Sequence, residues 1–143
     1  SYIKKTKHKI IHADHYSTVQ IFQNLISNAV KYTLKGKVEV ILDDWDKEKL
    51  QVIVKDTGIG ISKDYLSKLF APFSQEDVGH KREFEGNGLG LALVKKYVEI
   101  NNADILVESE KNKGSIFTVI FNKKVNNSEE IVSKSFERTK III

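Results

Sequence analysis

The sequence lacks several features that would place it in a familiar class of protein. It contains no cysteine, which excludes disulfide bonds and thiolate metal sites and fits a reducing cytoplasm. No apolar run approaches the ~20 residues that cross a bilayer, and there is no signal-peptide pattern. The lysines are scattered rather than interleaved with aromatic residues, so we expect no binding to nucleic acid.

The composition is that of one folded domain. The chain has 143 residues, of which 41% are hydrophobic and 29% charged, and its formal net charge is +4. This length and balance suit a single apolar core, and we expect the isolated domain to be a monomer. Because the sequence starts at Ser1, we expect the natural protein to be longer. Whether that parent protein is anchored in a membrane stays open.

Hydrophobic periodicity predicts helices interleaved with hairpins. Apolar residues at helical spacing predict helices over residues 15–33 and 89–100, and a short helix over residues 62–70 is capped by Ser62. Alternating patterns predict strands and two hairpins. The predicted strands are residues 8–14, 37–42, 50–56, 103–109 and 115–121. This order predicts an α+β fold, a two-layer sandwich whose helices cover one face of a mixed, mostly antiparallel sheet.

A long loop leads into a cluster of glycines. Residues 71–86 have no periodicity, and loops of such length inside a compact domain are usually functional or disordered. The stretch "EGNGLGLALVKKYVEINN" follows, with Gly86, Gly88 and Gly90 on alternate positions before a helix. These glycines either expose backbone N–H groups to a phosphate at the helix start or simply allow the loop to bend.

A polar stripe runs along the first predicted helix. Asn24, Asn28 and Lys31 share one side of it, roughly opposite the apolar residues. The stripe is either an ordinary solvated face or part of a site. Carboxamide oxygens suit a hard cation such as magnesium, and a lysine supplies a point charge for phosphate.

The motif "DTGIGI" directly follows a predicted strand. In one interpretation Asp56 caps its own turn and the glycines supply positive φ. In the other, Asp56 accepts a hydrogen bond from an amino group of a ligand, while Gly58 and Gly60 let the ligand's ring approach.

Together these motifs resemble the ATP-binding catalytic domain of sensor histidine kinases, in the superfamily that also contains gyrase, heat-shock chaperones and MutL and shares the Bergerat fold. The resemblance covers about residues 14–121. It implies a catalytic domain over residues 1–121 with an ATP lid at about 74–87, and a tail or linker over 122–143. The matching segments are "NLISNAVKYT" (N box), "DTGIGI" (first glycine box), "LFAPF" (F box), "GNGLGLALVKKYV" (second glycine box) and "GSIFTVIF" (closing strand).

The resemblance also implies ATP and Mg²⁺ as ligands and assigns roles. Asn28 would be the principal magnesium ligand with Asn24 beside it, Asp56 would bind the adenine amino group, and Phe70 would pack under the lid. The implied catalytic residues are Asn24, Asn28 and Lys31. The implied ATP-binding residues are Asn28, Lys31, Tyr32, Asp56, Gly58, Gly60, Ile61, Phe73, Lys81, Arg82, Gly86, Asn87, Gly88, Leu89, Gly90, Leu91 and Ser115.

Relatives that hydrolyse ATP carry a glutamate base where this chain has Asn24, and an amide cannot take a proton from water. We therefore expect phosphoryl transfer to a histidine on a separate dimerisation hairpin of the same protein, with a receiver domain downstream. The four histidines of the chain, His8, His12, His15 and His80, lack the context of that acceptor.

Two other functions stay open, a protein-serine kinase of the anti-sigma type and a non-catalytic nucleotide-binding module. The last residues, "ERTKIII", resemble the first strand of a receiver domain or form a disordered tail.

Overall fold

The computed structural model describes residues 1–7, 10–71, 90–123 and 139–142. Its elements are β1 (Tyr2–Lys4), β2 (Ile10–Ala13), α1 (His15–Lys31), β3 (Val38–Asp44), β4 (Lys49–Asp56), α2 (Lys63–Leu66), α3 (Gly90–Ile100), β5 (Asp104–Glu110), β6 (Gly114–Asn122) and β7 (Thr139–Ile142). Of the helices in these ranges, none combines the length and apolarity needed to cross a bilayer.

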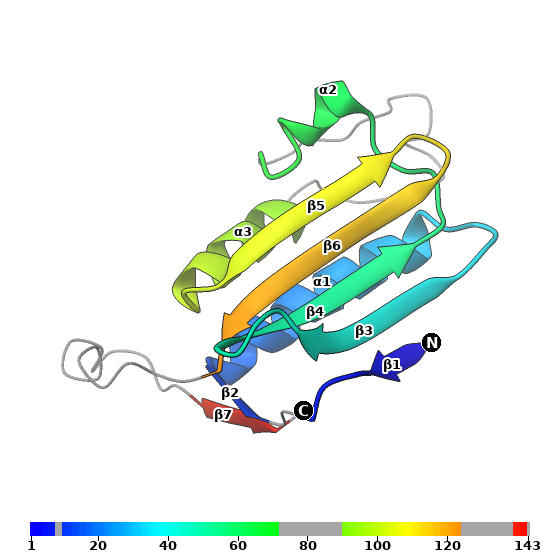
Figure 1. Cartoon of the computed structure of the whole chain (residues 1–143). Coiled ribbons are helices and arrows are strands. Elements are labelled where there is room, and N and C mark those ends of the chain that lie inside the picture. Colours follow the sequence, from blue (N-terminus) through cyan, green and yellow to red (C-terminus); the bar gives the residue numbers. More distant parts are fainter. Residues whose placement is uncertain (8–9, 72–89, 124–138, 143) are drawn as a thin grey trace.

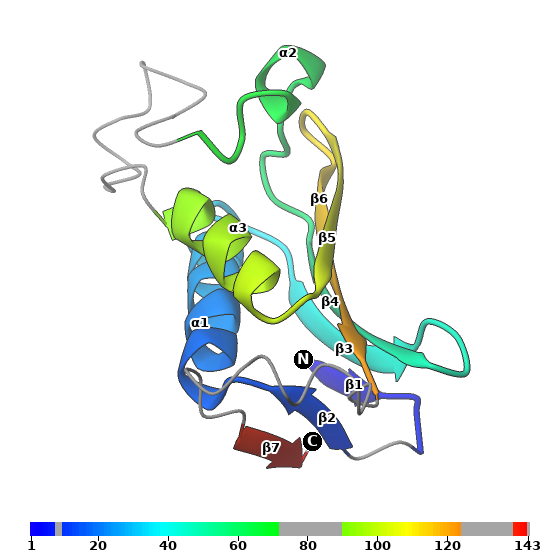
Figure 2. The same cartoon turned by 90° about the vertical axis from the view of Figure 1, so that its left-hand side faces the viewer.

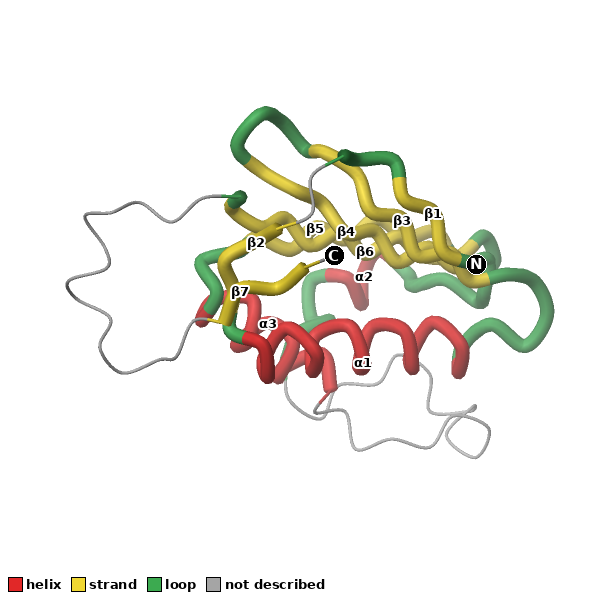
Figure 3. Tube along the Cα trace, turned by 90° about the horizontal axis from the view of Figure 1, so that it is seen from below, coloured by secondary structure: helices red, strands yellow, loops and turns green. Residues whose placement is uncertain are grey.

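Five strands form one sheet in the order β1-β3-β4-β6-β5 (Figure 1). Strands β3, β4, β6 and β5 pair antiparallel, and β1 runs parallel to β3. Helices α1 and α3 pack together on one face of the sheet, which gives two layers (Figures 2 and 3). The predicted α+β sandwich with a mixed, mostly antiparallel sheet is confirmed, as are both predicted hairpins.

Helix α1 carries the apolar stripe that joins the two layers. Asp14 is its N-cap, and the Asp14 carboxylate accepts a hydrogen bond from the Ser17 N–H at 2.8 Å. Ile21, Leu25 and Ala29 are buried against the sheet at helical spacing. The polar stripe of the same helix is therefore turned away from this core.

Helix α3 ends where the sequence predicts. Asn102 has a φ of 50°. The Asn102 N–H donates to Glu99 O at 3.0 Å, and the Ala103 N–H donates to Val98 O at 3.0 Å. This pair of bonds is a Schellman motif, in which asparagine tolerates the left-handed conformation better than most residues.

One side chain ties the end of α3 to the start of α1. The Asn101 Oδ1 accepts the Asp14 N–H at 2.7 Å, and its Nδ2 donates to Ser17 Oγ at 2.8 Å. Since Asp14 is also the N-cap of α1, the two helices share one polar junction. The sequence analysis predicted the helix stop at this position but not the link.

Several boundaries differ from the predictions. Helix α1 ends at Lys31 rather than Thr33, and only Lys63–Leu66 of the third predicted helix is α-helical, with turns over residues 67–70. Strand β1 was not predicted, because three residues are too few to show a period.

The first predicted strand does not join the main sheet. Strand β2 pairs antiparallel with β7, which lies in the predicted tail (Figure 3). Residues 139–142 therefore return to the domain as a strand, while the division into 1–121 and 122–143 stays a prediction.

Candidate functional site

A carboxyl group stands at the end of an otherwise apolar line of side chains on β4. Leu50, Val52 and Val54 alternate on the helix-covered face and are buried in the core. Asp56 occupies the next position of this alternation and is only 7% exposed. Burying an ionisable side chain at a core position costs free energy unless the side chain is hydrogen-bonded or paired.

The strands beside Asp56 carry polar residues at the same level. Ser115 on β6 lies opposite Asp56, and Ser109 on β5 lies opposite Ser115. The two serine Oγ atoms are 2.8 Å apart, and Ser109 Oγ also accepts the Ile61 N–H at 2.8 Å. One row deeper, Val54, Phe117 and Val107 are apolar neighbours. The apolar core therefore ends with this apolar row, and the next row, which contains Asp56, is polar.

The Asp56 carboxyl is held by the turn that follows it. Its Oδ1 accepts the Gly58 N–H at 2.9 Å. Burial raises the pKa of Asp56 above its usual range, and the N–H groups of Gly58 and Ser115 partly offset this effect. The Thr33 hydroxyl also lowers that pKa, although it makes no hydrogen bond of standard geometry.

The two glycines of this turn are required by close backbone approaches. A Cβ on Gly58 would lie 2.3 Å from Tyr32 O, at the end of α1. Gly60 has a φ of +67°, and a Cβ there would lie 2.0 Å from Glu110 O. The missing side chains thus make room for the protein itself, and access for a ligand's ring stays a prediction. That either glycine contacts a nucleotide stays a prediction.

The polar stripe of α1 is half-buried rather than fully solvated. Asn24 Nδ2 donates to Gln20 O at 2.8 Å, and Asn24 Oδ1 would lie 2.9 Å from a Cβ on Gly90. The Lys31 Nζ lies 5.5 Å from the centre of the Tyr32 ring. Asn24 therefore brings the stripe into contact with the first residue of α3, where a helix dipole favours negative charge.

The stripe offers neutral oxygen ligands for a hard cation. Among the described residues, no group of three or more histidine or acidic side chains is arranged to hold a metal ion. The Asn28 carboxamide lies on the half-buried stripe, and its oxygen fits the preference of Mg²⁺, provided that other ligands come from a bound molecule or water.

A shallow hollow of about 220 Å³ opens beside the Asp56–Gly58 turn. Two of its lining residues, Tyr32 and Gly58, are among the predicted ATP-binding residues. Its other lining residues are Leu34, Lys35, Thr57, Ile59 and Asn112. Burial raises the pKa of the Tyr32 phenol, so this hydroxyl stays protonated at neutral pH.

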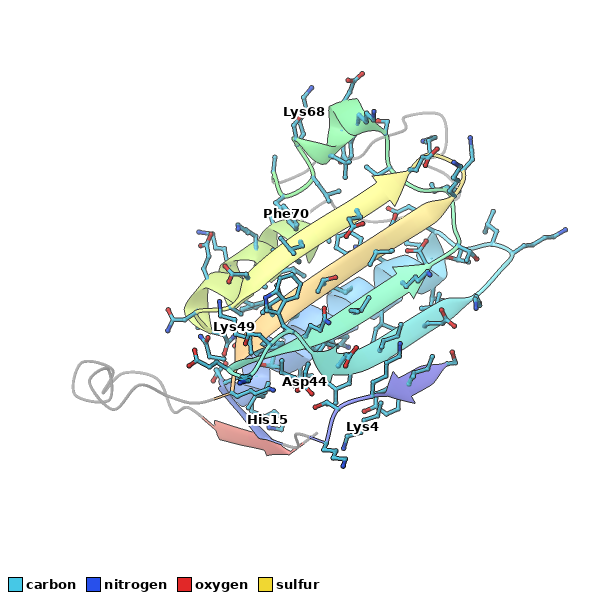
Figure 4. The ribbon with its side chains drawn as sticks, in the orientation of Figure 1. Lys4, His15, Asp44, Lys49, Lys68 and Phe70 are labelled. Carbon is cyan, nitrogen blue, oxygen red and sulfur yellow. The ribbon has the colours of Figure 1, made fainter. Side chains whose placement is uncertain are left out.

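The structure groups part of the predicted site and does not describe the rest. Ile61, Leu91 and Phe70 are partly buried against the core (Phe70 is labelled in Figure 4). The predicted lid at residues 74–87 lies outside the described residues. The other predicted site residues outside them are Phe73, Lys81, Arg82, Gly86, Asn87, Gly88 and Leu89.

Two polar residues beside Asp56 were given no role by the sequence analysis. Ser109 could have been found because it occupies an inward position of an alternating strand. Thr33 gave no such signal, since it follows the helix and precedes a loop. Of the histidines, His15 is exposed at the first position of α1, where the predicted helix over residues 15–33 also begins (Figure 4).

The chain is similar to known proteins in both sequence and fold. A family model described as "Histidine kinase-, DNA gyrase B-, and HSP90-like ATPase" matches residues 13–125. The chain is 45% identical over 112 residues to the autoinducer 2 sensor kinase/phosphatase LuxQ of Vibrio vulnificus, covering 75% of this chain. It is 35% identical over 145 residues to hybrid signal transduction histidine kinase F of Dictyostelium discoideum, covering 95% of this chain.

The chain spans 13% of the length of each of these two relatives. Among solved structures, full-length ShkA in complex with AMPPNP superposes with a TM-score of 0.75 at 28% identity. That superposition covers 87% of this chain and 26% of ShkA.

Proposed function

The chain belongs to the family of histidine kinase-, DNA gyrase B- and HSP90-like ATPases and is homologous to the catalytic domains of sensor histidine kinases. On this premise we propose that it binds MgATP and donates the γ-phosphate to a histidine on a separate dimerisation domain. One observation carries the proposal, the buried Asp56 carboxyl where the apolar face of the sheet ends. The AMPPNP complex of ShkA supports ATP as the ligand.

The purine end of the nucleotide would bind at Asp56. An ionised carboxylate accepts hydrogen bonds and cannot donate them, so it selects an amino group on the base. Gly58 N–H already occupies Oδ1, which leaves lone pairs of the carboxylate for a ligand. Ser115, one strand away, is close enough to belong to the same pocket floor.

The phosphate end would bind along α1 and at the start of α3. Lys31 would supply a positive charge, and the contact between Asn24 and Gly90 brings the stripe to the helix N-terminus. Asn28 and Asn24 would hold Mg²⁺, whose charge offsets that of the phosphates when it is bound.

Transfer rather than hydrolysis follows from Asn24. A carboxamide takes no proton from water, and the Asn24 Nδ2 is already bonded to Gln20 O. In the proposed reaction an imidazole nitrogen attacks the γ-phosphorus, the bond from that phosphorus to the bridging oxygen breaks, and ADP leaves. The protein contributes placement and charge neutralisation.

The experiment combines this chain with the purified dimerisation hairpin of its parent protein and γ-labelled ATP. We expect label on the hairpin that is lost in acid and stable in alkali, as for a phosphohistidine. A hairpin whose acceptor histidine is replaced is the matched control and stays unlabelled. Acid-stable label on serine, or no label on a folded hairpin, would refute histidine transfer.

A further inference from the structure

Thr33 holds a buried hydroxyl that has no well-formed hydrogen bond. It follows Tyr32, the C-cap of α1, and its N–H donates to Val30 O at 3.4 Å. The Oγ1 atom is buried and has no partner of standard geometry among the described atoms. Buried hydroxyls normally find partners, so this exception needs an explanation.

The hydroxyl lies beside the Asp56–Gly58 turn, where we propose that the base binds. Thr33 Oγ1 would be 2.7 Å from a Cβ on Gly58, whose N–H donates to Asp56 Oδ1. The hydroxyl is near enough to the Asp56 carboxyl to lower its pKa. Hydrogen bonds at ligand sites are often long without the ligand and shorten in the complex.

We propose that Thr33 is a positioning residue for base specificity. Its hydroxyl supports the Asp56 carboxylate in the ionised form, aimed at the 6-amino group of adenine. Thr33 thereby helps the site to choose adenine over purines that carry a 6-oxo group. This inference rests on the proposed function, since it deepens the role of the same site.

The chemistry depends on the protonation state of one carboxyl. Ionised Asp56 accepts from the amino group of adenine and repels the carbonyl oxygen of a 6-oxopurine. Protonated Asp56 donates, and the preference weakens or reverses. Burial favours the protonated form, whereas the Thr33 hydroxyl and the Gly58 N–H favour the ionised form.

Few other groups around Asp56 act on its protonation state. Those that act on it are uncharged, namely the Thr33 hydroxyl at the end of α1 and the N–H groups of Gly58 and Ser115. On β3 the residue opposite Asp56 is Val38. Lys31 at the end of α1 and Tyr32, its C-cap, are not among the groups that shift the pKa of Asp56.

The test is a calorimetric titration of the whole chain with ADP and with inosine diphosphate, from about pH 5 to about pH 8. Thr33→Val removes the hydroxyl at nearly constant shape, and Thr33→Ser keeps it. In Thr33→Val we expect the pH midpoint for loss of ADP binding to rise by about one unit. That shift makes ADP binding about tenfold weaker on the acid side of both midpoints and changes it little on the alkaline side.

Three further results are expected. The preference for ADP over inosine diphosphate falls in Thr33→Val as the pH is lowered, and Thr33→Ser keeps the wild-type profile. In an Asp56→Asn background, Thr33→Val has no further effect, because the group that it supports is gone.

Several results would overturn the inference. An unchanged midpoint in Thr33→Val, or a weakening that is equal at every pH, assigns Thr33 a merely structural role. Wild-type protein that binds no ADP would instead refute the proposed function, and the inference with it. If Thr33→Val does not fold, a crystal structure of the wild type with ADP decides. Thr33 Oγ1 more than about 3.5 Å from the carboxylate would refute the contact.

Discussion

At the scale of single residues, Asp56 meets two opposing demands. The alternation of β4 places it on the core face, where burial opposes ionisation. The recognition of an amino group that we propose for it needs the ionised form. The turn after the strand partly meets both demands, because the Gly58 N–H donates to the carboxylate. Gly58 can lie there because it has no side chain, which would clash with Tyr32 O.

Asp56→Asn should weaken ATP and ADP binding by roughly 1.5–3 kcal/mol, because one charge-assisted hydrogen bond is lost. Calorimetry at neutral pH measures the change. Asp104→Asn, at an exposed position of β5, is the matched control and should bind as the wild type does. Unchanged affinity in Asp56→Asn would remove Asp56 from the adenine site.

The same substitution should stabilise the protein at neutral pH. Because burial raises the pKa of Asp56 in the folded state, the fold favours the protonated carboxyl, and stability falls as the pH rises through that pKa. The carboxamide that replaces this carboxyl does not ionise. Urea unfolding should therefore give Asp56→Asn a higher free energy of unfolding at pH 7, and the difference should shrink toward acid pH. A difference that is constant with pH would show that the raised pKa is not its cause.

Asn28→Ala should remove the magnesium-dependent part of ATP affinity, since the half-buried Asn28 carboxamide is the proposed oxygen ligand of Mg²⁺. Titrations with Mg²⁺ and with EDTA measure that part directly. Ser27→Ala, an exposed neighbour on α1, is the control. Equal wild-type affinity with and without the metal would reject the ligand role.

At the scale of elements, polar contacts as well as apolar faces hold the two helices together. Asn101 at the end of α3 bonds the N-cap residue of α1, and Asn24 within α1 touches the first residue of α3. The helix next to the predicted lid therefore cannot shift without disturbing the polar stripe. Periodicity predicted both helices, but contacts between their ends have no sequence period and were missed.

Asn101→Ala should destabilise the domain by about 1–3 kcal/mol, because it leaves the Asp14 N–H without its acceptor and removes the donor to the Ser17 hydroxyl. Urea denaturation measures the change. Asn122→Ala is the control, since Asn122 is exposed and makes a single bond to Asn102 O; it should change stability by less than about 0.5 kcal/mol. Equal effects of the two substitutions would show that the junction between the helices contributes nothing special.

At the scale of the whole molecule, the chain has the fold of its ATPase family, and Asn24 stands where the resemblance implies a glutamate base in relatives that hydrolyse ATP. The family match over residues 13–125 covers helices α1, α2 and α3, strands β3 to β6 of the main sheet, Asp56 with its polar neighbours, and the stripe of α1. The separate β2–β7 pair joins a segment that precedes α1 to residues beyond that match.

The isolated chain should therefore release negligible phosphate from ATP. A malachite-green assay over many turnovers, with buffer alone as the baseline, measures it. Steady release above that baseline would mean that another group acts as the base, since the Asn24 amide cannot.

The sequence by itself determined the two layers, both hairpins and the end of α3, because alternation, helical spacing and capping are local properties of the chain. It also indicated the family, since the N box, the F box and the two glycine boxes are defined only by residue identity, spacing and order. Only the tertiary structure decided the pairing of β1 with β3, the Asn101 junction and the position of Thr33 beside Asp56. Each of these joins residues that are far apart along the chain, and such contacts arise only when the layers pack.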